Sequence, residues 1–321
     1  MYSIAQYTPT YYTQWNDFVA NSKNGTFLFH RDYMEYHSDR FTDFSLLVFE
    51  KNKLVAVLPA NRVGGVVYSH QGLTYGGIVL TKNYGYEKVK YLYALLLKFL
   101  QENQIRLIYI KSIPSIYHKT PSFESELLLN YNDARFEKRL MNLAIDYTKE
   151  YIISKSKIKH FKRLATSGFR IEADNNFDVF WNKVLIPRLK SRYDVKPVHT
   201  LEEIKLLHRR FPENIIQYNI YHENSIMAGI TLFITDNVVK SQYGATTETG
   251  EKLRALDYLF ITLIKYFSDK KNAFDMGTVN DGESYNSGLL KQKEELGCSI
   301  FPQDFYSVTT DSYKLLDNVL I

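Results

Sequence analysis

Alternating apolar and polar residues mark two β-hairpins in this chain. The segment FEKNKLVAVL (49–58) alternates on both sides of a central Lys-Asn-Lys, and YHENSIMAGI (221–230) does the same around Glu-Asn-Ser. Alternation with a period of two is typical of strands that bury one face, and short polar turns join antiparallel strands. The pattern therefore predicts one hairpin in each half of the chain.

The two halves also share the segments that follow each hairpin. Residues 49–74 align with 221–246 without a gap, and the helical segments YLYALLLKFL (91–100) and YLFITLIKYF (258–267) match after a five-residue change in loop length. Apolar residues cover more than one face of this helix, so we expect it to be packed on both sides. A short strand follows each helix, IRLIYIKSI in the first half and AFDMGTV in the second. The sequence thus predicts a strand–helix–strand crossover beside each hairpin.

The repeat predicts an α/β fold, mixed α+β in detail, of two tandem modules, each a mixed sheet flanked by helices. We expect the first module over 1–148 and the second over 173–321, joined by a basic helix and strand over 149–172. Two interpretations of this bridge stay open. It is a helix with a solvated basic face, or its cations hold the phosphates of a nucleotide, a lipid pyrophosphate or transfer RNA.

Composition and charge limit the class of protein. Of the 321 residues, 45% are hydrophobic and 23% charged, as in a folded globular protein. No apolar run approaches the roughly 20 residues that span a bilayer, and the N-terminus lacks a signal-peptide pattern, so we expect a cytoplasmic protein. The single cysteine, Cys298, agrees with a reducing compartment. A net charge of +5 favours phosphorylated ligands or an anionic membrane surface, but it is too small to predict nucleic-acid binding.

Common catalytic and metal-binding signatures are missing from the sequence. His30 and His37 could share one helix face, but no third ligand stands near them, so we expect no metal site. The HExxH, GxSxG and GxxxxGK[ST] patterns of zinc hydrolases, serine hydrolases and NTPases do not occur.

Longer segments carry a more specific signal through their order. The first half contains NSKNGTFLFHRDYMEYH and VAVLPANRVGGVVYSHQGLTYGGIVL. The second contains SQYGATTETG, LRALDYLF, FDMG and NDGESYNSGLLKQKEELG. Taken in this order, they resemble the FemAB-type family of tandem GNAT acyltransferases, the peptidoglycan-bridge aminoacyltransferases and their relatives. The resemblance covers nearly the whole chain.

This resemblance implies an acyltransferase that transfers an acyl or aminoacyl group to an amine of a cell-envelope precursor. The acceptor would be an amino sugar or a peptide on a nucleotide- or lipid-linked intermediate. No cofactor would be bound permanently, and the acyl donor, a co-substrate, would be aminoacyl-tRNA or acyl-CoA. The implied partners are the UDP- or lipid-linked precursor and transfer RNA as donor, with a peripheral membrane contact left open and no DNA.

Two other functions stay open. One is an acyl-CoA-dependent N-acetyltransferase of a small amine or amino sugar, and the other is a catalytically inactive tandem module that binds a glycan or a protein partner. GNAT modules hold the donor's pyrophosphate at the N-terminus of the central helix. Here that stretch, TTETGEKLRA, has a single glycine, Gly250, between Glu248 and Glu251, and it does not match the usual glycine-rich fingerprint.

The resemblance places catalysis on two residues, Lys293 and Asp275. A family lysine at the place of Lys293 stabilises charge on the reacting carbonyl or the leaving oxygen, whereas Lys291 is the alternative to test beside it. Asp275 ends a predicted strand, where it would orient the incoming ammonium or, alternatively, anchor a loop. Gln292 stands where many relatives carry phenylalanine.

The substrate-binding candidates are polar residues expected to line a cleft between the modules. Arg254 would bind a donor or acceptor phosphate or, alternatively, pair with Glu251 or Glu248 on its own helix. The set consists of His70, Gln71 and Tyr75 from the first module and Gln242, Tyr243, Arg254, Asn280, Tyr285 and Asn286 from the second.

Overall fold

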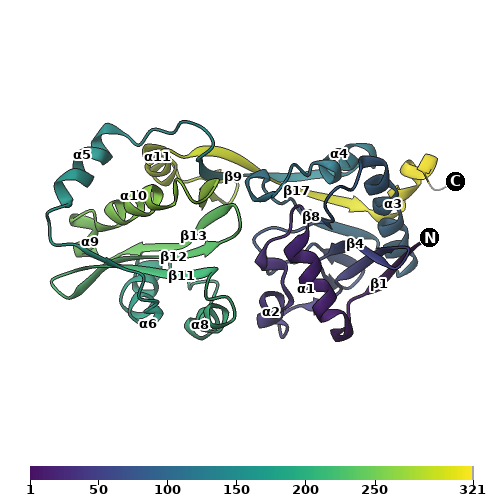
Figure 1. The fold of residues 1–321 in the computed structure, drawn as a ribbon, viewed down its shortest axis with the longest axis horizontal. Coiled ribbons are helices and arrows are strands. Elements are labelled where there is room, and N and C mark those ends of the chain that lie inside the picture. The colour runs from purple at the N-terminus through teal and green to yellow at the C-terminus, as the bar shows by residue number, and fades with distance from the viewer. Residues whose placement is uncertain (320–321) are drawn as a thin grey trace. The chain divides into compact units, whose positions relative to one another are not determined.

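The computed structural model describes residues 1–319, which fold into two compact units (Figure 1). The first unit contains Met1–Leu140 and the C-terminal residues from Pro302 onward, and the second contains Met141–Phe301. The division differs from the expected one at 149–172, because the long strands β9 (Arg135–Asp146) and β17 (Ser299–Thr309) each begin in one unit and end in the other. A boundary inside a continuous strand leaves no loop or composition change that the sequence could display.

The first unit combines two sheets with a central helix. One sheet has the strand order β1-β3-β4-β7, and the other continues from β17 through β8, β6 and β5 to β2. Its further elements are β1 (Tyr2–Gln6), η1 (Pro9–Tyr11), α1 (Tyr12–Asn21), η2 (Phe27–Phe29), α2 (Arg31–Met34), η3 (Glu35–His37), β2 (Thr42–Asp43), β3 (Leu46–Glu50), β4 (Lys53–Leu58), β5 (Asn61–Val63), β6 (Val66–Tyr68), β7 (Val79–Leu80), α3 (Tyr86–Glu102), β8 (Leu107–Lys111), η4 (Ser115–Tyr117), α4 (Glu124–Tyr131) and η6 (Thr310–Val319).

The second unit is a mixed sheet in the order β10-β11-β12-β13-β14-β9, with helices on both faces. The helices α10 and α11 lie on one face of the sheet and α6 and α8 on the other (Figure 1). Its elements are α5 (Lys155–Leu164), β10 (Arg170–Glu172), α6 (Phe177–Phe180), the π-helix η5 (Trp181–Leu185), α7 (Ile186–Tyr193), α8 (Leu201–Arg210), β11 (Ile215–His222), β12 (Ser225–Ile234), β13 (Val238–Thr246), α9 (Glu248–Lys252), α10 (Ala255–Phe267), β14 (Ala273–Thr278), β15 (Asn280–Asp281), β16 (Ser284–Tyr285) and α11 (Ser287–Glu295).

The predicted hairpins are confirmed, and their turns are alike. Lys51 and Asn52 join β3 to β4 with φ of 48° and 66°, and Glu223 and Asn224 join β11 to β12 with φ of 46° and 63°. Two consecutive left-handed residues are the mark of a type I′ turn, which favours asparagine and matches the twist of antiparallel strands. Each hairpin also carries one extra residue at the same place, Val55 in β4 and Met227 in β12.

The gap-free alignment of the third strand is wrong beyond Ser69. Ala56 pairs with Leu80, whereas Ala228, its counterpart in the repeat, pairs with Thr246. In the first unit the strand is therefore split into β6 and β7 by an inserted loop, which is anchored where the Ser69 N–H donates to the Tyr109 carbonyl (2.8 Å). The loop-length change thus lies inside the strand rather than between the strand and the helix.

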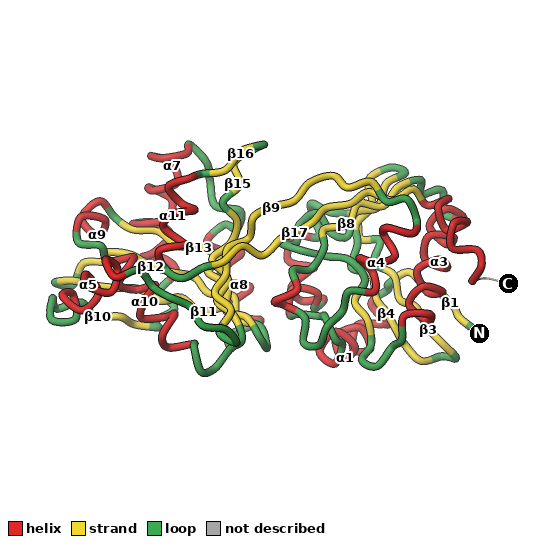
Figure 2. Tube along the Cα trace, turned by 90° about the horizontal axis from the view of Figure 1, so that it is seen from above, coloured by secondary structure: helices red, strands yellow, loops and turns green. Residues whose placement is uncertain are grey.

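The twin helices are packed on both sides, as predicted. Helix α3 buries seven residues and is covered by α4 and η6 in addition to the sheet (Figures 1 and 2). Helix α10 lies on the strands β11–β13 and is covered by α5, where Phe161 stacks on Tyr258 with ring centroids 4.9 Å apart. A helix buried on two faces needs apolar residues around most of its circumference, which explains the repeated apolar decapeptide. Among the described residues, no helix is both long enough and apolar enough to span a membrane.

Candidate functional site

A polar pocket of about 580 Å³ lies in the second unit, where β13 ends and the next helices begin. The strand β13 contributes its last residues, and α9, α10, α11 and α7 supply the walls. The lining residues are Leu185, Arg188, Leu189, Arg192, Gly244, Ala245, Thr246, Gly250, Glu251, Arg254, Leu256, Asp257, Asn286, Gly288, Leu289 and Gln292. We call it the arginine pocket.

Arg254 holds an unusual place at the start of α10. It is the N-cap of that helix, with a left-handed backbone (φ 57°), and its side chain is partly buried in the pocket wall. Such a backbone is uncommon for a long side chain and is retained only where the surroundings demand it. The buried Nη1 atom of Arg254 has no hydrogen-bond partner among the described residues.

The expected ion pair between Arg254 and Glu251 is wrong. The two carboxylate oxygens of Glu251 instead accept hydrogen bonds from Arg188 and Arg192 on α7, each at 2.5 Å. The arginine contacts, Arg188 first, lower the pKa of Glu251. Since Glu251 already has two cations, it does not pair with Arg254, which lines the pocket with its buried Nη1 unpartnered among the described residues.

The pocket therefore has an excess of positive charge. Its other carboxylate, Asp257, is paired with Lys157 of α5 at 2.7 Å. Arg188 and Arg192 were not among the residues expected from the sequence, although their spacing of four in RLKSR puts them on one helical face. The π-helical turn Trp181–Leu185 just before them is a feature often found at functional sites.

Gly250 has no room for a side chain. A Cβ atom at this position would lie 2.1 Å from the Met227 carbonyl oxygen and 2.5 Å from Thr246 Oγ1. The N–H of Gly250 donates to Thr247 Oγ1 (3.0 Å), which caps α9. The single glycine of this stretch is thus required for the close contact of α9 with β12.

Gln242 and Tyr243 lie in β13, but neither lines the arginine pocket. Gln242 is an extra residue in the ladder with β12, and its buried Oε1 atom has no hydrogen-bond partner among the described residues. Tyr243 bonds through its hydroxyl to Nδ1 of His199 (2.6 Å), and burial raises the pKa of Tyr243 to about 12. Tyr243 therefore fixes the segment before α8 to the sheet.

Lys293 and Asp275 lie together with a third residue, Lys240, at the end of β14. Asp275 is 1% exposed and accepts hydrogen bonds from the Gly277 N–H (2.6 Å) and from Lys240 Nζ (3.1 Å). Lys293 is 5% exposed, and its Nζ donates to the carbonyl oxygens of Gly277 and Thr278, both at 3.0 Å. Burial and then the nearby Lys240 lower the pKa of Lys293 to about 8. Sequence reasoning did not single out Lys240.

The C-terminal candidates divide between the pocket and the scaffold. Asn286 lines the arginine pocket and caps α11 by accepting the Leu289 N–H (2.9 Å). Asn280 accepts the Met141 N–H (2.7 Å), which ties the β15–β16 hairpin to β9, and Tyr285 is half exposed on that hairpin. Of these three, the structure brings only Asn286 together with Arg254.

A second pocket, of about 480 Å³, lies in the first unit and contains two of the expected residues, His70 and Gln71. The rings of Tyr68 and Tyr109 stack here with centroids 5.2 Å apart and an interplanar angle of 10°. The remaining lining residues are Ser69, Ile110, Lys111, Glu137, Lys138, Phe305 and Tyr306. We call it the tyrosine pocket.

Burial lowers the pKa of two groups in the tyrosine pocket, Lys111 and His70. Lys111 donates to the Gln71 and Leu73 carbonyl oxygens, and burial followed by the Lys138 charge lowers the pKa of Lys111 to about 8. His70 is 3% exposed and stacks on His37, and burial lowers the pKa of His70 to about 3. Tyr75 is not part of the pocket, since it lies in the core and hydrogen-bonds Thr26 (3.0 Å).

No protein-family model matches the sequence, and no curated protein matches it. Solved structures do. FemX covers 98% of this chain and 99% of its own with a TM-score of 0.71 at 12% identity. L-PGS from Bacillus licheniformis covers 98% and 94% with a TM-score of 0.61 at 12% identity. A tandem GNAT protein from the clavulanic acid biosynthesis pathway covers 97% and 99% with a TM-score of 0.53 at 10% identity. The chain has the tandem GNAT fold of FemX.

The tandem GNAT fold identifies the helix at whose N-terminus the arginine pocket lies. The strands β13 and β14 run parallel and are joined by α9 and α10, so α10 is the central helix of the second GNAT module. The arginine pocket lies at the N-terminus of this helix, where backbone N–H groups and the helix dipole favour anions.

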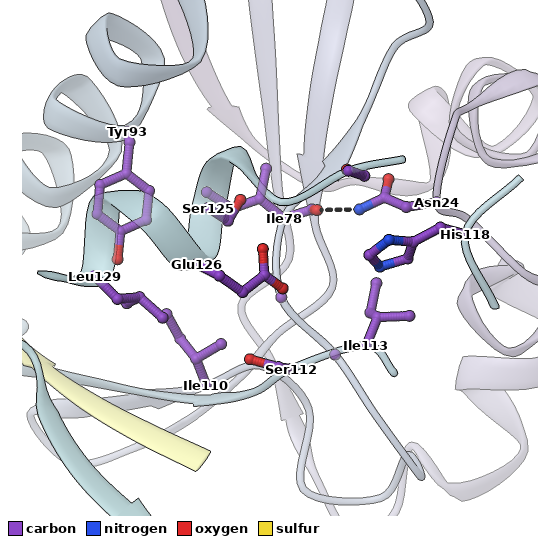
Figure 3. A pocket seen from close by; sticks show the side chains of 13 residues that line it. Asn24, Ile78, Tyr93, Ile110, Ser112, Ile113, His118, Ser125, Glu126 and Leu129 are labelled. Atoms are coloured by element: carbon purple, nitrogen blue, oxygen red, sulfur yellow. Dashed lines mark hydrogen bonds between the residues drawn. The ribbon is translucent and has the colours of Figure 1, made fainter. Parts of the chain in front are cut away.

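A small cavity also lies in the first unit, lined by residues just before β7 and just after β8. It measures about 20 Å³, which is room for one water molecule, and helix α4 closes it (Figure 3). The Glu126 carboxyl points into this cavity near Ile78 and Ser112, and its buried Oε2 has no hydrogen-bond partner among the described residues. Burial raises the pKa of Glu126 to about 7.

Proposed function

We propose that this protein is a GNAT-type acyltransferase that transfers an acyl or aminoacyl group to an amine of a cell-envelope precursor. The observation that carries the proposal is Arg254 at the start of the central helix. Its buried Nη1 has no hydrogen-bond partner among the described residues, and the carboxylates of the pocket that it lines are already paired. Arginine is suited to phosphate because its planar group presents several donors at once. The arginine pocket is therefore the site we assign to a phosphate of the acyl donor.

The surface beside the pocket favours aminoacyl-tRNA as that donor. Helix α5 is held to the pocket by the Lys157–Asp257 ion pair, so Lys157 faces inward. The other lysines and the arginine of α5 are exposed and form no ion pairs among the described residues: Lys155, Lys159, Lys162 and Arg163. A stripe of exposed cations binds a chain of phosphates better than a single nucleotide. The N–H of Gly250, in addition, already donates to Thr247 Oγ1, which leaves one backbone donor fewer for a pyrophosphate.

The tyrosine pocket is the site we assign to the acceptor. A stacked pair of tyrosines offers a flat face to a sugar or nucleobase, and Lys111 and Lys138 supply positive charge for phosphate. Both features suit an amino sugar or peptide carried on a UDP- or lipid-linked phosphate. That the two pockets open into one cleft stays a prediction.

The chemistry requires a new C–N bond and the loss of the ester bond of the donor. The acceptor amine attacks the donor carbonyl, the bond to the leaving oxygen breaks, and the amine nitrogen loses one proton to solvent. Charge develops on the leaving oxygen, where a positioned cation lowers the barrier. We assign this role to the Lys293 ammonium, with Asp275 holding the end of β14 to which Lys293 is bonded.

The decisive experiment compares two lysines of one helix. Transfer from radiolabelled aminoacyl-tRNA to UDP-linked and lipid-linked amino sugars and peptides is measured for the wild type, Lys293→Ala and Lys291→Ala. We expect kcat to fall about 100-fold for Lys293→Ala and to change less than about twofold for Lys291→Ala, whose side chain is exposed. Equal activity of all three proteins would refute the role of Lys293.

The same assay separates the alternatives. Acetyl-CoA is offered as donor in parallel with aminoacyl-tRNA, and binding of UDP-sugars is measured by calorimetry. Transfer from acetyl-CoA alone would make the protein an N-acetyltransferase. Binding of a UDP-sugar without turnover of any donor would make it a catalytically inactive binding module.

A further inference from the structure

Lys240, Lys293 and Asp275 lie around Gly277, so two positive side chains are set against one negative side chain. Lys240 and Asp275 are direct neighbours in the parallel ladder of β13 and β14. Asp275 and Lys293 are buried, and the Lys240 side chain is 12% exposed. Lys240 Nζ lies 3.6 Å from where a Gly277 Cβ would stand, and Lys293 Nζ donates to the carbonyl oxygen of the same glycine. Two amines therefore share a space that holds one carboxylate.

The backbone at this point brings the two amines together. Gly277 has φ of 76°, and the ladder between β14 and β9 is irregular between Asp275 and Thr278. Only glycine adopts this backbone readily, and the irregularity turns the carbonyl oxygens of Gly277 and Thr278 toward α11. Lys293 reaches both of these carbonyl oxygens from α11.

The partners of the two lysines differ in kind. Lys240 donates to a carboxylate oxygen of Asp275, whereas Lys293 donates to two neutral carbonyl oxygens. A buried ammonium without a direct carboxylate partner is the one that gives up its proton more readily. The groups that act on the charge of Lys293 are Lys240 from β13, Asp275 from β14 and Cys298 after α11.

We propose that Lys240 is a positioning residue for acyl transfer: by engaging Asp275 it leaves Lys293 bonded to neutral carbonyl oxygens, ready to give a proton to the leaving group. The inference rests on the proposed function. In the step, the acyl carbon–oxygen bond breaks, a proton passes from Lys293 Nζ to the leaving oxygen, and Lys293 regains a proton from the water that took one from the amine. Without Lys240, the charge of Asp275 is no longer shared with a second amine, and it holds the proton on Lys293 more strongly. This agrees with the lowered pKa of Lys293.

The test reads the proton on Lys293 directly, by ¹⁵N NMR of lysine amino groups over a pH titration. The Lys293 signal is assigned with Lys293→Arg. We expect a midpoint near 8 in the wild type, a rise of about one pH unit in Lys240→Met, and a midpoint close to wild type in Lys240→Arg. Circular dichroism checks that each variant is folded, and Lys240→Arg keeps the ion pair if Lys240→Met does not fold.

The pH profile of transfer is measured on the same proteins. Because the protonated lysine is the active form, kcat should fall as pH rises through the Lys293 midpoint, and this limb should move upward with the midpoint in Lys240→Met. An unchanged midpoint in a folded Lys240→Met would overturn the inference. If the NMR midpoint of Lys293 moves in Lys240→Met but the pH at which kcat falls does not, proton transfer from Lys293 is overturned. Failure of the wild type with every donor would instead refute the proposed function, while the NMR midpoints still decide whether Lys240 controls Lys293.

Discussion

Lys157 of α5 and Asp257 of α10 form an ion pair with Nζ and Oδ1 2.7 Å apart, and both side chains are largely buried (8% and 15% exposed). The pair joins the basic helix to the central helix of the second module. It also decides which cations of α5 face solvent.

Replacing Lys157 should therefore destabilise the second module. Lys157→Met leaves Asp257 charged and without its closest partner, so we expect a loss of about 3 kcal/mol in the free energy of unfolding. Urea denaturation followed by circular dichroism measures it, with Lys159→Met on the exposed face as the matched control. A loss of less than about 0.5 kcal/mol for both variants would show that the pair contributes nothing.

Arg254→Ala should weaken binding of the acyl donor rather than unfold the protein. Arg254 lines the pocket, and its Nη1 has no partner among the described residues. If it binds the donor phosphate as proposed, its removal costs a charge-assisted hydrogen bond, about 2 kcal/mol or about thirtyfold in Kd. Filter binding of aminoacyl-tRNA at fixed salt measures the change. Arg210→Ala, on α8 outside the arginine pocket, is the control. If both variants bind as the wild type does, Arg254 does not contact the donor.

Acid should destabilise the first module through His70. Its pKa is about 3 in the folded chain because it is buried, and about 6.5 when unfolded, so the folded state keeps the neutral form. The contribution of neutral His70 to the free energy of unfolding is complete above pH 6.5 and is lost as the pH falls from 6.5 toward 3. Between pH 7.5 and pH 5 we expect His70 by itself to cost about 2 kcal/mol of the free energy of unfolding.

His70→Asn tests this origin of the acid sensitivity. Asparagine does not titrate and tolerates the left-handed backbone at this position (φ 67°). We expect a smaller loss of stability between pH 7.5 and pH 5 in this variant, measured by urea unfolding at each pH. His222→Asn, at a partly exposed site on β11, should behave as the wild type. An equal loss in all three proteins would assign the acid sensitivity to other groups.

Glu126 should destabilise the first module at high pH, whereas His70 destabilises it at low pH. Burial raises the folded pKa of Glu126 to about 7 from about 4.5, so its contribution to stability is present below pH 4.5 and is lost as pH rises to 7. Glu126→Gln removes the charge and keeps the shape, and we expect it to raise the free energy of unfolding at pH 8 by about 3 kcal/mol relative to the wild type. Thermal unfolding at pH 5 and pH 8 measures the difference, which should shrink at the lower pH. A variant less stable than the wild type at pH 8 would contradict the expectation.

The α/β class, the tandem repeat and the doubly packed helices were predictable because each is written in local periodicity. The type I′ turns at Asn52 and Asn224 are an example, since the turn is set by the residues that form it. The candidate site was predicted only in part: Arg254 and Asn286 line the arginine pocket, but Arg188, Arg192 and Lys240 were missed. Their partners lie tens of residues away, so no local pattern marks them.

The sequence by itself determined the elements and their order in each half, because strand and helix periodicities depend on neighbours a few residues apart. Only the tertiary structure decided that Glu251 binds the two arginines of α7 and not Arg254. Only the tertiary structure decided, too, that Asp275 pairs with Lys240 while Lys293 donates to carbonyl oxygens. In both cases several cations compete for one carboxylate. Distances between segments remote in sequence settle that competition, and these exist only in the folded chain.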